Sequence, residues 1–593
     1  MSAVQAPYVP APGSSAGQSV RRLIVYTLLF ALVVITATGV QTLLSLILDA
    51  KIVLIGENTS IIAQGLAFTL IGGPLAAVLW WFLWRRLVEP AERGALAWGV
   101  YIAAMSIVAL VSTVTGFLGF LATLIEGDWN GSGLATGVIW AAVWMWHRWM
   151  WRHPMKGPMR LFAVPAVLGA AFGLVLGAGN AINLLNGIFS AATREITATP
   201  TIGGPWWAGT LQALIWTIGG TAVWVWHWYR EGARSSATGL ANVALILLGI
   251  LLASLATLGG MGVMLYVVLR LLFDNTDPLR ELMSPVGVAL AVAAVGTVVW
   301  TYHRSVAISR SPSTRQASIL ATSGVALIGA ASGLGVVVNS ALGILATPLA
   351  GEGLRPLLLG GLSALLVGGV AWTLTWRPHS PADAAAPAAG RRIYLIAIFG
   401  VSAVVALITL LVIGFQLFQA VLDGGSGLIE QIRAPLGLLT ATALVAGYHF
   451  GVWQHDRSDA ATSAPAPRRR TIGEVILVTG ADPAPLVAAI ESVTGASVTV
   501  WRAASVAPEA LPGVEEGIPG VRAQGPLPVP PPIEDLPVAP AAYAPTTAVG
   551  VAPAATPTPD AEHLAQALDK ITGRRVLVLV GPGSRLDVIP LAD

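Results

Sequence analysis

Four histidines recur at one position near the ends of apolar runs. The segment VWMWHR that ends at Arg148 returns as VWVWH, as VWTYHR and, in shortened form, as AGYH. Imidazoles at a matched depth on neighbouring helices can hold a b-type haem or a metal ion, so His147, His227, His303 and His449 are candidate ligands. The aromatic and arginine neighbours favour a different role, an interfacial layer in which ring bodies lie among acyl chains and polar tips lie among headgroups.

Amide side chains form a second candidate set in the outer halves of long apolar runs. They are Asn180, Asn183, Asn186, Asn339 and Gln416. The first three lie three residues apart in one run, and such amides are compatible with a cavity for a neutral polar ligand. Interhelical hydrogen bonds are the alternative, which the spacings Gly173-x-x-x-Gly177 and Gly329-x-x-x-Gly333 in the same runs favour because small residues allow close helix packing.

Other chemistry is excluded or disfavoured by what the sequence lacks. It contains no cysteine, which removes disulfides, thiolate-bound zinc, iron–sulfur clusters and covalently attached haem. No Asp, Glu, Lys or Arg lies near the middle of an apolar run, whereas proton-coupled carriers usually place ionisable groups there. No Ser-His-Asp set or HExxH motif is evident. We therefore expect a protein that is not an enzyme and has no cofactor.

The composition indicates which elements carry these residues. The chain has 593 residues, of which 55% are hydrophobic and 11% charged, against about 25% charged in soluble proteins. Twelve apolar runs of membrane-spanning length come in six pairs, and each pair opens just after an arginine. The predicted fold class is an all-α polytopic membrane bundle of twelve transmembrane helices in six repeated hairpins, over residues 21–456, with a small C-terminal cytosolic α/β domain.

The basic residues between the runs predict the orientation. Seventeen lysines and arginines lie on the side where the pairs open, against six on the other side, which also carries most of the acids. The positive-inside rule then places the first side and both termini in the cytoplasm of a multi-pass cell-membrane protein. A formal net charge of +3 is too small to indicate nucleic acid as a partner, so membrane lipid is the expected one.

The ends of the chain differ from its apolar centre. Residues 1–20 are predicted to be a disordered tail and residues 457–471 a linker. Residues 472–593 form the expected cytosolic module, in which a helix-strand pattern from Leu486 to Val500 repeats from Leu564 to Val578. Two such halves would share one sheet, extended by a hairpin through Gly581–Ser584. The Pro- and Ala-rich stretch at about 506–559 between the halves is predicted to be disordered.

The repeated pattern resembles an uncharacterised multi-pass membrane family, domain of unknown function 5671. The resemblance rests on the arginine opening, the acidic end of the long runs and the aromatic-histidine ending, and it covers about Arg21 to Asp456. Two aromatic endings depart from it, since those at Trp84 and Trp376 lack the histidine. The resemblance implies the multi-pass architecture and brings no activity.

Three functions remain open. The first is a non-enzymatic scaffold, sensor or assembly partner whose cytosolic module binds a protein. The alternative is a transporter or channel for a neutral or apolar small solute, indicated by the amides. The weaker alternative is a haem-binding redox protein, indicated by the histidines.

Overall fold

The protein consists of two units that are considered separately, Met1–Asp456 and Arg457–Asp593. The computed structural model describes residues 15–49, 59–197, 205–274, 276–346, 353–376, 388–422, 428–463, 472–480, 482–502, 564, 567–568, 574–581 and 586–591. The predicted disordered stretch at about 506–559 lies outside these residues.

The described part of the first unit is helical. Its helices are α1 (Ser15–Leu48), α2 (Thr59–Ala67), α3 (Gly73–Arg86), α4 (Pro90–Arg93), α5 (Leu96–Ile125), α6 (Gly131–Arg152), α7 (Val164–Ile196), α8 (Trp206–Val225), α9 (Gly239–Ala244), α10 (Ala253–Phe273), α11 (Leu279–Met283), α12 (Val286–Arg310), α13 (Pro312–Ala346), α14 (Leu354–Thr375), α15 (Ala388–Leu422) and α16 (Leu428–Ser463). The π-helical turns Phe68–Gly72 and Leu245–Leu252 join α2 to α3 and α9 to α10, and Trp226–Arg230 extends α8.

Eleven helical segments of the described chain are long and apolar enough to cross a membrane. They correspond to eleven of the twelve predicted runs, and the remaining run is α6. Its 22 residues include five tryptophans together with His147, Arg148 and Arg152, which lower its mean hydropathy. A helical polytopic bundle is therefore present, and α6 is a helix of spanning length with an amphipathic composition.

Consecutive long helices pack as pairs through glycines. A methyl group on Gly173 of α7 would overlap the backbone nitrogen of Trp224 near the end of α8, and one on Gly333 of α13 would overlap that of Leu365 in α14. Gly116 of α5 faces Gly137 of α6 in the same way. Because lipid provides no hydrophobic force between helices, such backbone approach supplies the dispersion contacts that hold each pair.

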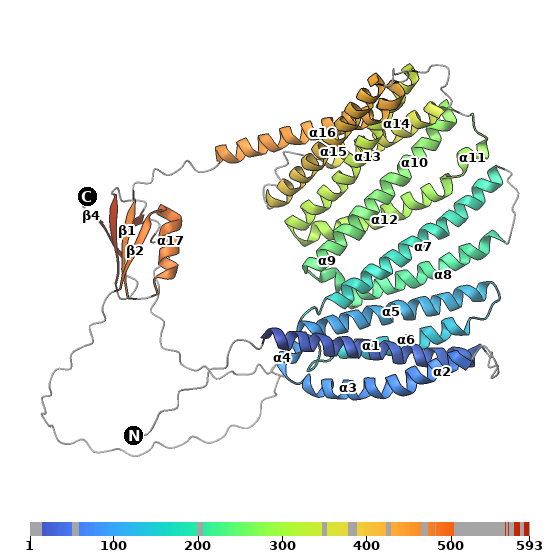
Figure 1. Ribbon diagram of the computed structural model, residues 1–593, viewed down its shortest axis with the longest axis horizontal. Helices are drawn as coiled ribbons and strands as arrows, with labels where there is room; N and C mark the ends of the chain where they lie inside the picture. The colour runs from blue at the N-terminus through green and yellow to red at the C-terminus, as the bar shows by residue number, and fades with distance from the viewer. Residues whose placement is uncertain are drawn as a thin grey trace, which may run out of the picture. The chain divides into compact units, whose positions relative to one another are not determined.

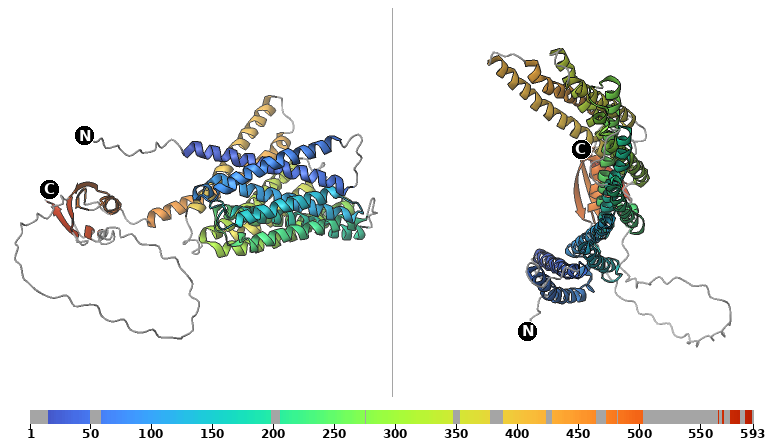
Figure 2. Two further views of the ribbon diagram at one scale, coloured as in Figure 1. Left: turned by 90° about the horizontal axis from the view of Figure 1, so that it is seen from below. Right: turned by 90° about the vertical axis from the view of Figure 1, so that its right-hand side faces the viewer.

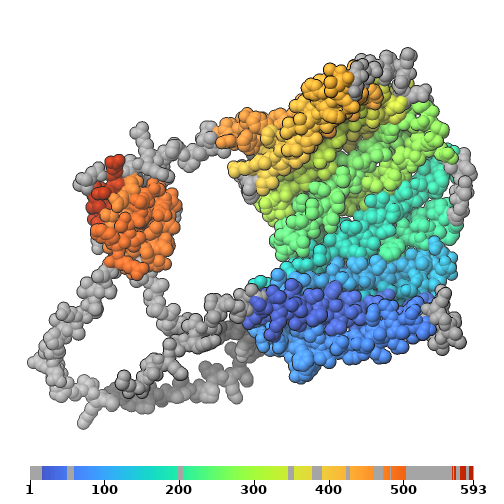
Figure 3. Space-filling view, viewed as in Figure 1, coloured from blue at the N-terminus to red at the C-terminus, as the bar shows by residue number. Residues whose placement is uncertain are grey.

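Neighbouring pairs are joined by one recurring helix contact. The first helix of a pair packs against the second helix of the next pair, as α1 does on α6, α5 on α8, α7 on α12 and α10 on α14. The same contact joins α13 to α16, since the backbones of Gly335 and Gly437 approach closely. The pairs consequently lie side by side in sequence order, from α1–α3 at one end to α15–α16 at the other (Figure 1). The space-filling view shows the same order as successive bands (Figure 3).

The row does not close on itself. In the right-hand view of Figure 2 its two ends, the helices α1–α3 (blue) and the helices α15–α16 (gold), lie apart from each other. A central channel enclosed by all the helix pairs is thus not the arrangement that the junctions produce.

Two predicted boundaries are corrected by the helices. Helix α1 begins at Ser15, inside the stretch 1–20 that was expected to be disordered, and α16 runs to Ser463, inside the expected linker 457–471. Polar residues continue both helices beyond their apolar parts, so composition marks the end of the apolar run and not the end of the helix. The rest of both stretches lies outside the described residues.

The second unit contains a four-stranded sheet. Strands β1 (Glu474–Thr479), β2 (Ser497–Arg502), β3 (Arg575–Val580) and β4 (Leu586–Leu591) lie in the order β2-β1-β3-β4, with β1 parallel to β2 and β3, and β4 antiparallel to β3. Helix α17 (Ala484–Thr494) ends at Gly495, whose φ of 63° is left-handed. Leu486 and Leu564, from the two halves of the predicted repeat, share one core against the sheet. The predicted small sheet is present, whereas the helix predicted for the second half lies mostly outside the described residues.

Glycine packing within a pair can be tested on α7. We expect Gly173→Val to lower the thermal stability of the detergent-purified protein by about 1–3 kcal/mol, because the added carbons meet backbone that cannot rotate away. Gly179→Val in the same helix is the control, since a Cβ there meets nothing within 4 Å. Equal melting temperatures for the two variants would contradict the packing described for α7 and α8.

Candidate functional site

The four recurring histidines are buried inside their own helix pairs. Their exposed fractions are 2% for His147, 4% for His227, 3% for His303 and 0% for His449. In each, Nδ1 lies 2.8 or 2.9 Å from the carbonyl oxygen four residues earlier, and it must donate because a carbonyl only accepts. Each ring is thereby fixed in one orientation.

Each imidazole faces the first helix of its pair. His147 Nε2 lies 2.9 Å from the Tyr101 hydroxyl of α5, and His449 lies 6.2 Å, between ring centres, from Tyr394 of α15. A Cβ on Gly169 would overlap the ring of His227, and one on Gly249 would lie 2.6 Å from Cγ of His303. The expectation that the histidine tips lie among headgroups is therefore wrong, because the rings fill space inside the pairs.

The four histidines were also candidate ligands of a haem or a metal ion. They lie on α6, α12, α16 and the extension of α8, and each is buried against the first helix of its own pair. Among the described residues, no group of three or more His, Cys, Asp or Glu side chains is placed to hold a metal ion. The arrangement gives the histidines a packing role that sequence spacing alone did not indicate.

Tryptophans carry the contact from one pair to the next. The Trp228 indole donates to the Tyr302 hydroxyl at 2.7 Å, and its ring lies 5.5 Å from His303. Trp376 repeats both contacts one unit later, with Tyr448 at 2.8 Å and His449 at 5.7 Å. At the corresponding place, Trp84 stacks on Trp149 at 5.3 Å. Aromatic contacts therefore join the endings of neighbouring pairs in register.

The candidate amides are distributed among separate contacts. Asn339 accepts a hydrogen bond from Arg433 of α16 at 3.0 Å, and Asn186 accepts one from Ser190 at 3.0 Å. Asn180 donates to the Leu176 carbonyl of its own helix at 2.9 Å, and Asn183 is exposed. Gln416 Oε1 is buried without a hydrogen-bond partner among the described atoms. The packing role suggested for these amides fits Asn339, which bridges two pairs.

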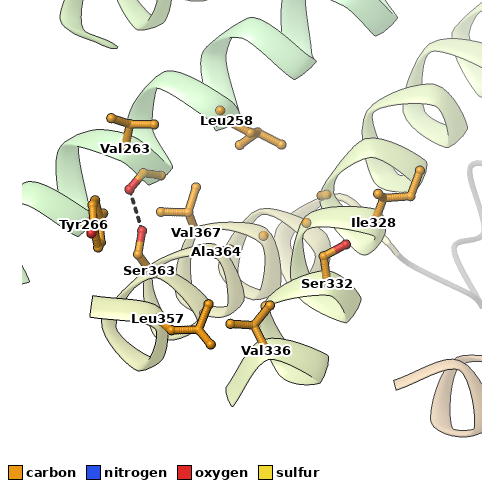
Figure 4. Close-up of a pocket in the computed structure, with 18 of the residues that line it drawn as sticks. Leu258, Val263, Tyr266, Ile328, Ser332, Val336, Leu357, Ser363, Ala364 and Val367 are labelled. Atoms are coloured by element: carbon orange, nitrogen blue, oxygen red, sulfur yellow. Dashed lines mark hydrogen bonds between the residues drawn. The ribbon is translucent and has the colours of Figure 1, made fainter. Parts of the chain in front are cut away.

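An open groove of about 780 Å³ lies between α10, α13 and α14 (Figure 4). Apolar side chains from the three helices line it, among them Leu258, Val263, Ile328, Val336, Leu357 and Val367. The Ser363 hydroxyl of α14 donates a hydrogen bond to the Gly262 carbonyl of α10 and so links the two helices. At one end Tyr266 accepts from Arg270, whose charge is paired with Asp274 at 3.1 Å. None of the five candidate amides is among the described residues that line this groove.

Sequence reasoning missed a charged cluster where α6 and the extension of α8 end. Glu231, whose side chain is 2% exposed, pairs with Arg148 at 2.7 Å and with Arg152. The Trp226 indole also donates to it, at 3.1 Å. Burial alone would raise the pKa of the Glu231 carboxyl, but hydrogen bonds from Arg152 and Arg148 outweigh it and hold the pKa below its usual value of 4.5. An acid directly after the arginine that ends a span was the available signal.

The sheet of the second unit leaves one face without a covering helix among the described residues. Val475 and Leu477 point to the face that packs on α17 and are fully buried. Ile476 and Leu577 alternate to the other face and are partly exposed, and Trp501 on that face is 58% exposed. This face therefore presents an apolar strip with a tryptophan at its edge strand, and at one end of the strip Arg575 forms an ion pair with Glu474 at 3.0 Å.

These features define a multi-pass integral membrane protein with a separate α/β unit. The model of the family described as Domain of unknown function (DUF5671) matches residues 22–146, 163–294 and 321–448, and the chain belongs to this family. The resemblance stated from the sequence is thus confirmed. Each match extends over most of two successive helix pairs, from α1 into α6, from α7 into α12 and from α13 into α16. No curated protein and no solved structure matches the chain.

The buried charge of Glu231 predicts an asymmetry between variants. Replacing Arg148 and Arg152 together by Gln leaves a carboxylate that is 2% exposed without its partners, whereas Glu231→Gln leaves arginines that are 37% and 39% exposed and stay hydrated. We expect the double variant to lose about 3 kcal/mol and the single variant clearly less, by thermal unfolding. Equal losses would contradict the burial of this carboxylate.

The same group gives a pH dependence. Because the folded-state pKa of Glu231 lies below the unfolded value near 4.5, its contribution is complete above that pH and is lost as the pH falls through the lower, folded-state value. The free energies of unfolding of wild type and Glu231→Gln should therefore become more similar as the pH falls through this acidic range.

Proposed function

We propose that this protein is a non-enzymatic membrane scaffold that displays its C-terminal α/β module in the cytoplasm. Six homologous hairpins, twelve spans in all, form its membrane part, and both termini are cytoplasmic. The observation that carries the proposal is the repeated junction, in which the first helix of each pair packs on the second helix of the next. A row built in this way has two ends and two broad apolar faces, and it supports attached parts without enclosing a central path.

The count of twelve spans is supported by α6. This helix occupies the same place in the row as α8, α12 and α14, because it packs against the first helix of the preceding pair. Its tryptophan-rich half suits the membrane interface, where indole rings are common. The arginine excess on the side where the pairs open supports the cytoplasmic assignment of that side.

The module provides a surface for a protein partner. Its open sheet face presents Ile476, Leu577 and Trp501, and tryptophan is frequent among residues that dominate protein interfaces. We assign this face to a partner with a complementary apolar strip.

The scaffold proposal is tested with the full chain, a chain ending before Arg468, and the variant Trp501→Ser. We expect the full chain purified from native membranes to carry one defined partner in constant stoichiometry, measured by mass photometry and mass spectrometry. The truncated chain and Trp501→Ser should lose it, while Glu491→Gln, on the helix that covers the opposite face, should retain it. Partner retention by the truncated chain would rule out the assigned role of the module.

The groove between α10, α13 and α14 favours a second function, binding or transport of an apolar solute. Its volume lies within the range of about 300–1,000 Å³ typical of ligand pockets. Its lining is apolar and rich in glycine, and the charge of Arg270 at one end is already paired. An apolar ligand would therefore meet no unpaired charge there.

The groove is tested by filling it. Gly259→Phe adds a ring at a residue that lines the groove, and the backbone tolerates the substitution since a Cβ there meets nothing within 4 Å. Gly369→Phe is the matched control, an equally open glycine of α14 that is not among the lining residues. Photo-crosslinking of an alkyl diazirine probe to α10 and α14 should fall strongly only in the first variant. Equal labelling of both variants would show that the groove binds no apolar ligand.

A further inference from the structure

A pocket of about 420 Å³ lies where α6 and the extension of α8 end, and its role is not part of either function above. It is lined by Arg148, Arg152, Trp226, Arg230 and Glu231 and is called the arginine pocket below. We propose that the arginine pocket binds a phosphate group, supplied by the headgroup of an anionic phospholipid.

Hydrogen bonds to Glu231 orient two of the arginine side chains in the pocket. Glu231 accepts from Nε of Arg148 and from a terminal nitrogen of Arg152, and the Glu231 backbone carbonyl lies 3.5 Å from the same Arg152 nitrogen. A guanidinium carries five N–H donors in a fixed fork, so each side chain keeps donors that Glu231 does not use. Since both arginine side chains remain more than a third exposed, those donors are accessible to a ligand.

The charge of the pocket favours an anion. Three guanidinium groups face one carboxylate, which leaves an excess of two positive charges. Arg230 has no carboxylate partner among the described residues, and its guanidinium lies 5.9 Å from the centre of the Trp226 ring. The planar guanidinium fork matches the paired oxygens of a phosphate, and such charge-assisted pairs are stronger than neutral hydrogen bonds.

The position along the helices favours a lipid as the source of the phosphate. The candidate span Trp206–Arg230 ends at Arg230, so the pocket lies at the level where headgroup phosphates are found. Trp226, 39% exposed, adds an indole of the kind that resides at this level. Basic pockets between helices on the cytoplasmic side are suited to anionic headgroups.

The experiment measures the melting temperature of the full chain in detergent during titration with phosphatidylglycerol or with phosphatidylcholine of the same chain length. We expect saturable stabilisation by phosphatidylglycerol only, and an affinity about fivefold lower in Arg230→Gln. Without lipid this variant should melt like wild type, because Arg230 takes no part in the Glu231 ion pairs. Arg230→Lys, which keeps the charge but loses the planar fork, should fall between the two.

The matched control is Arg304→Gln. Arg304 is also exposed, follows a recurring histidine, and lies over the ring of Trp300 at 5.4 Å, but it is not a lining residue of the pocket. Equal weakening by Arg304→Gln and Arg230→Gln, or equal stabilisation by the two lipids, would overturn the proposal.

A separate titration with inorganic phosphate distinguishes the source. If phosphate stabilises the wild type but not Arg230→Gln, while phosphatidylglycerol has no effect, the pocket is a phosphate site and the lipid source is rejected. If only phosphatidylglycerol acts, the headgroup assignment stands.

Discussion

Close backbone approach at glycines is the interaction on which the rest of this structure depends. In lipid, apolar side chains gain little by contacting each other instead of acyl chains, so association of helices relies on dense packing and on hydrogen bonds. Gly173 against α8 and Gly333 against α14 provide that density within pairs, while Gly335 against Gly437 provides it between pairs. Hydrogen bonds at the junctions, such as Trp140 to Gln41 at 2.8 Å and Arg433 to Asn339 at 3.0 Å, then fix the register.

The unit defined by the family matches has a physical counterpart in the aromatic contacts. Each match extends from one helix pair into the next, and in these three sets of two pairs a tryptophan of the first pair, namely Trp84, Trp228 or Trp376, reaches the aromatic ending of the second pair, just beyond the matched residues. The endings of the second pairs all carry a histidine, whereas the first pairs have Leu83, His227 and Thr375 at that position. The two pairs of one unit are thus joined by an aromatic contact at their endings, and the ending that receives the tryptophan carries a histidine in all three units.

The sequence was sufficient to predict where the helices and strands lie. It was insufficient to predict which side chains point inward. Apolar length located the helices, since lipid thickness sets a minimum run, and the offset between Leu486 and Leu564 correctly indicated a shared sheet. The histidines were misplaced because their neighbours in sequence, such as Trp146 at 49% exposure, do face outward, while Gly169 and Gly249 on other helices make the room that draws His227 and His303 inward. The groove combines distant segments, so no local pattern described it. In the Glu231 cluster only the adjacent Arg230 and Glu231 were visible in the sequence, because Arg148 and Arg152 come from another helix.

The distribution of polarity follows from this construction. Where helices cross, glycine and serine exclude water and lipid alike, and the one large hollow among the described residues of α10, α13 and α14 is apolar. Fixed charge is concentrated at helix ends, where Arg22 meets Glu92, Arg391 meets Asp456, and Arg148 and Arg152 meet Glu231. Ion pairs at these depths remain partly hydrated and cost less than charges at the bilayer centre. The ion pairs of the described residues in the first unit therefore gather toward the ends of the long helices, and at one end of the groove the charge of Arg270 is paired with Asp274 and Asp277.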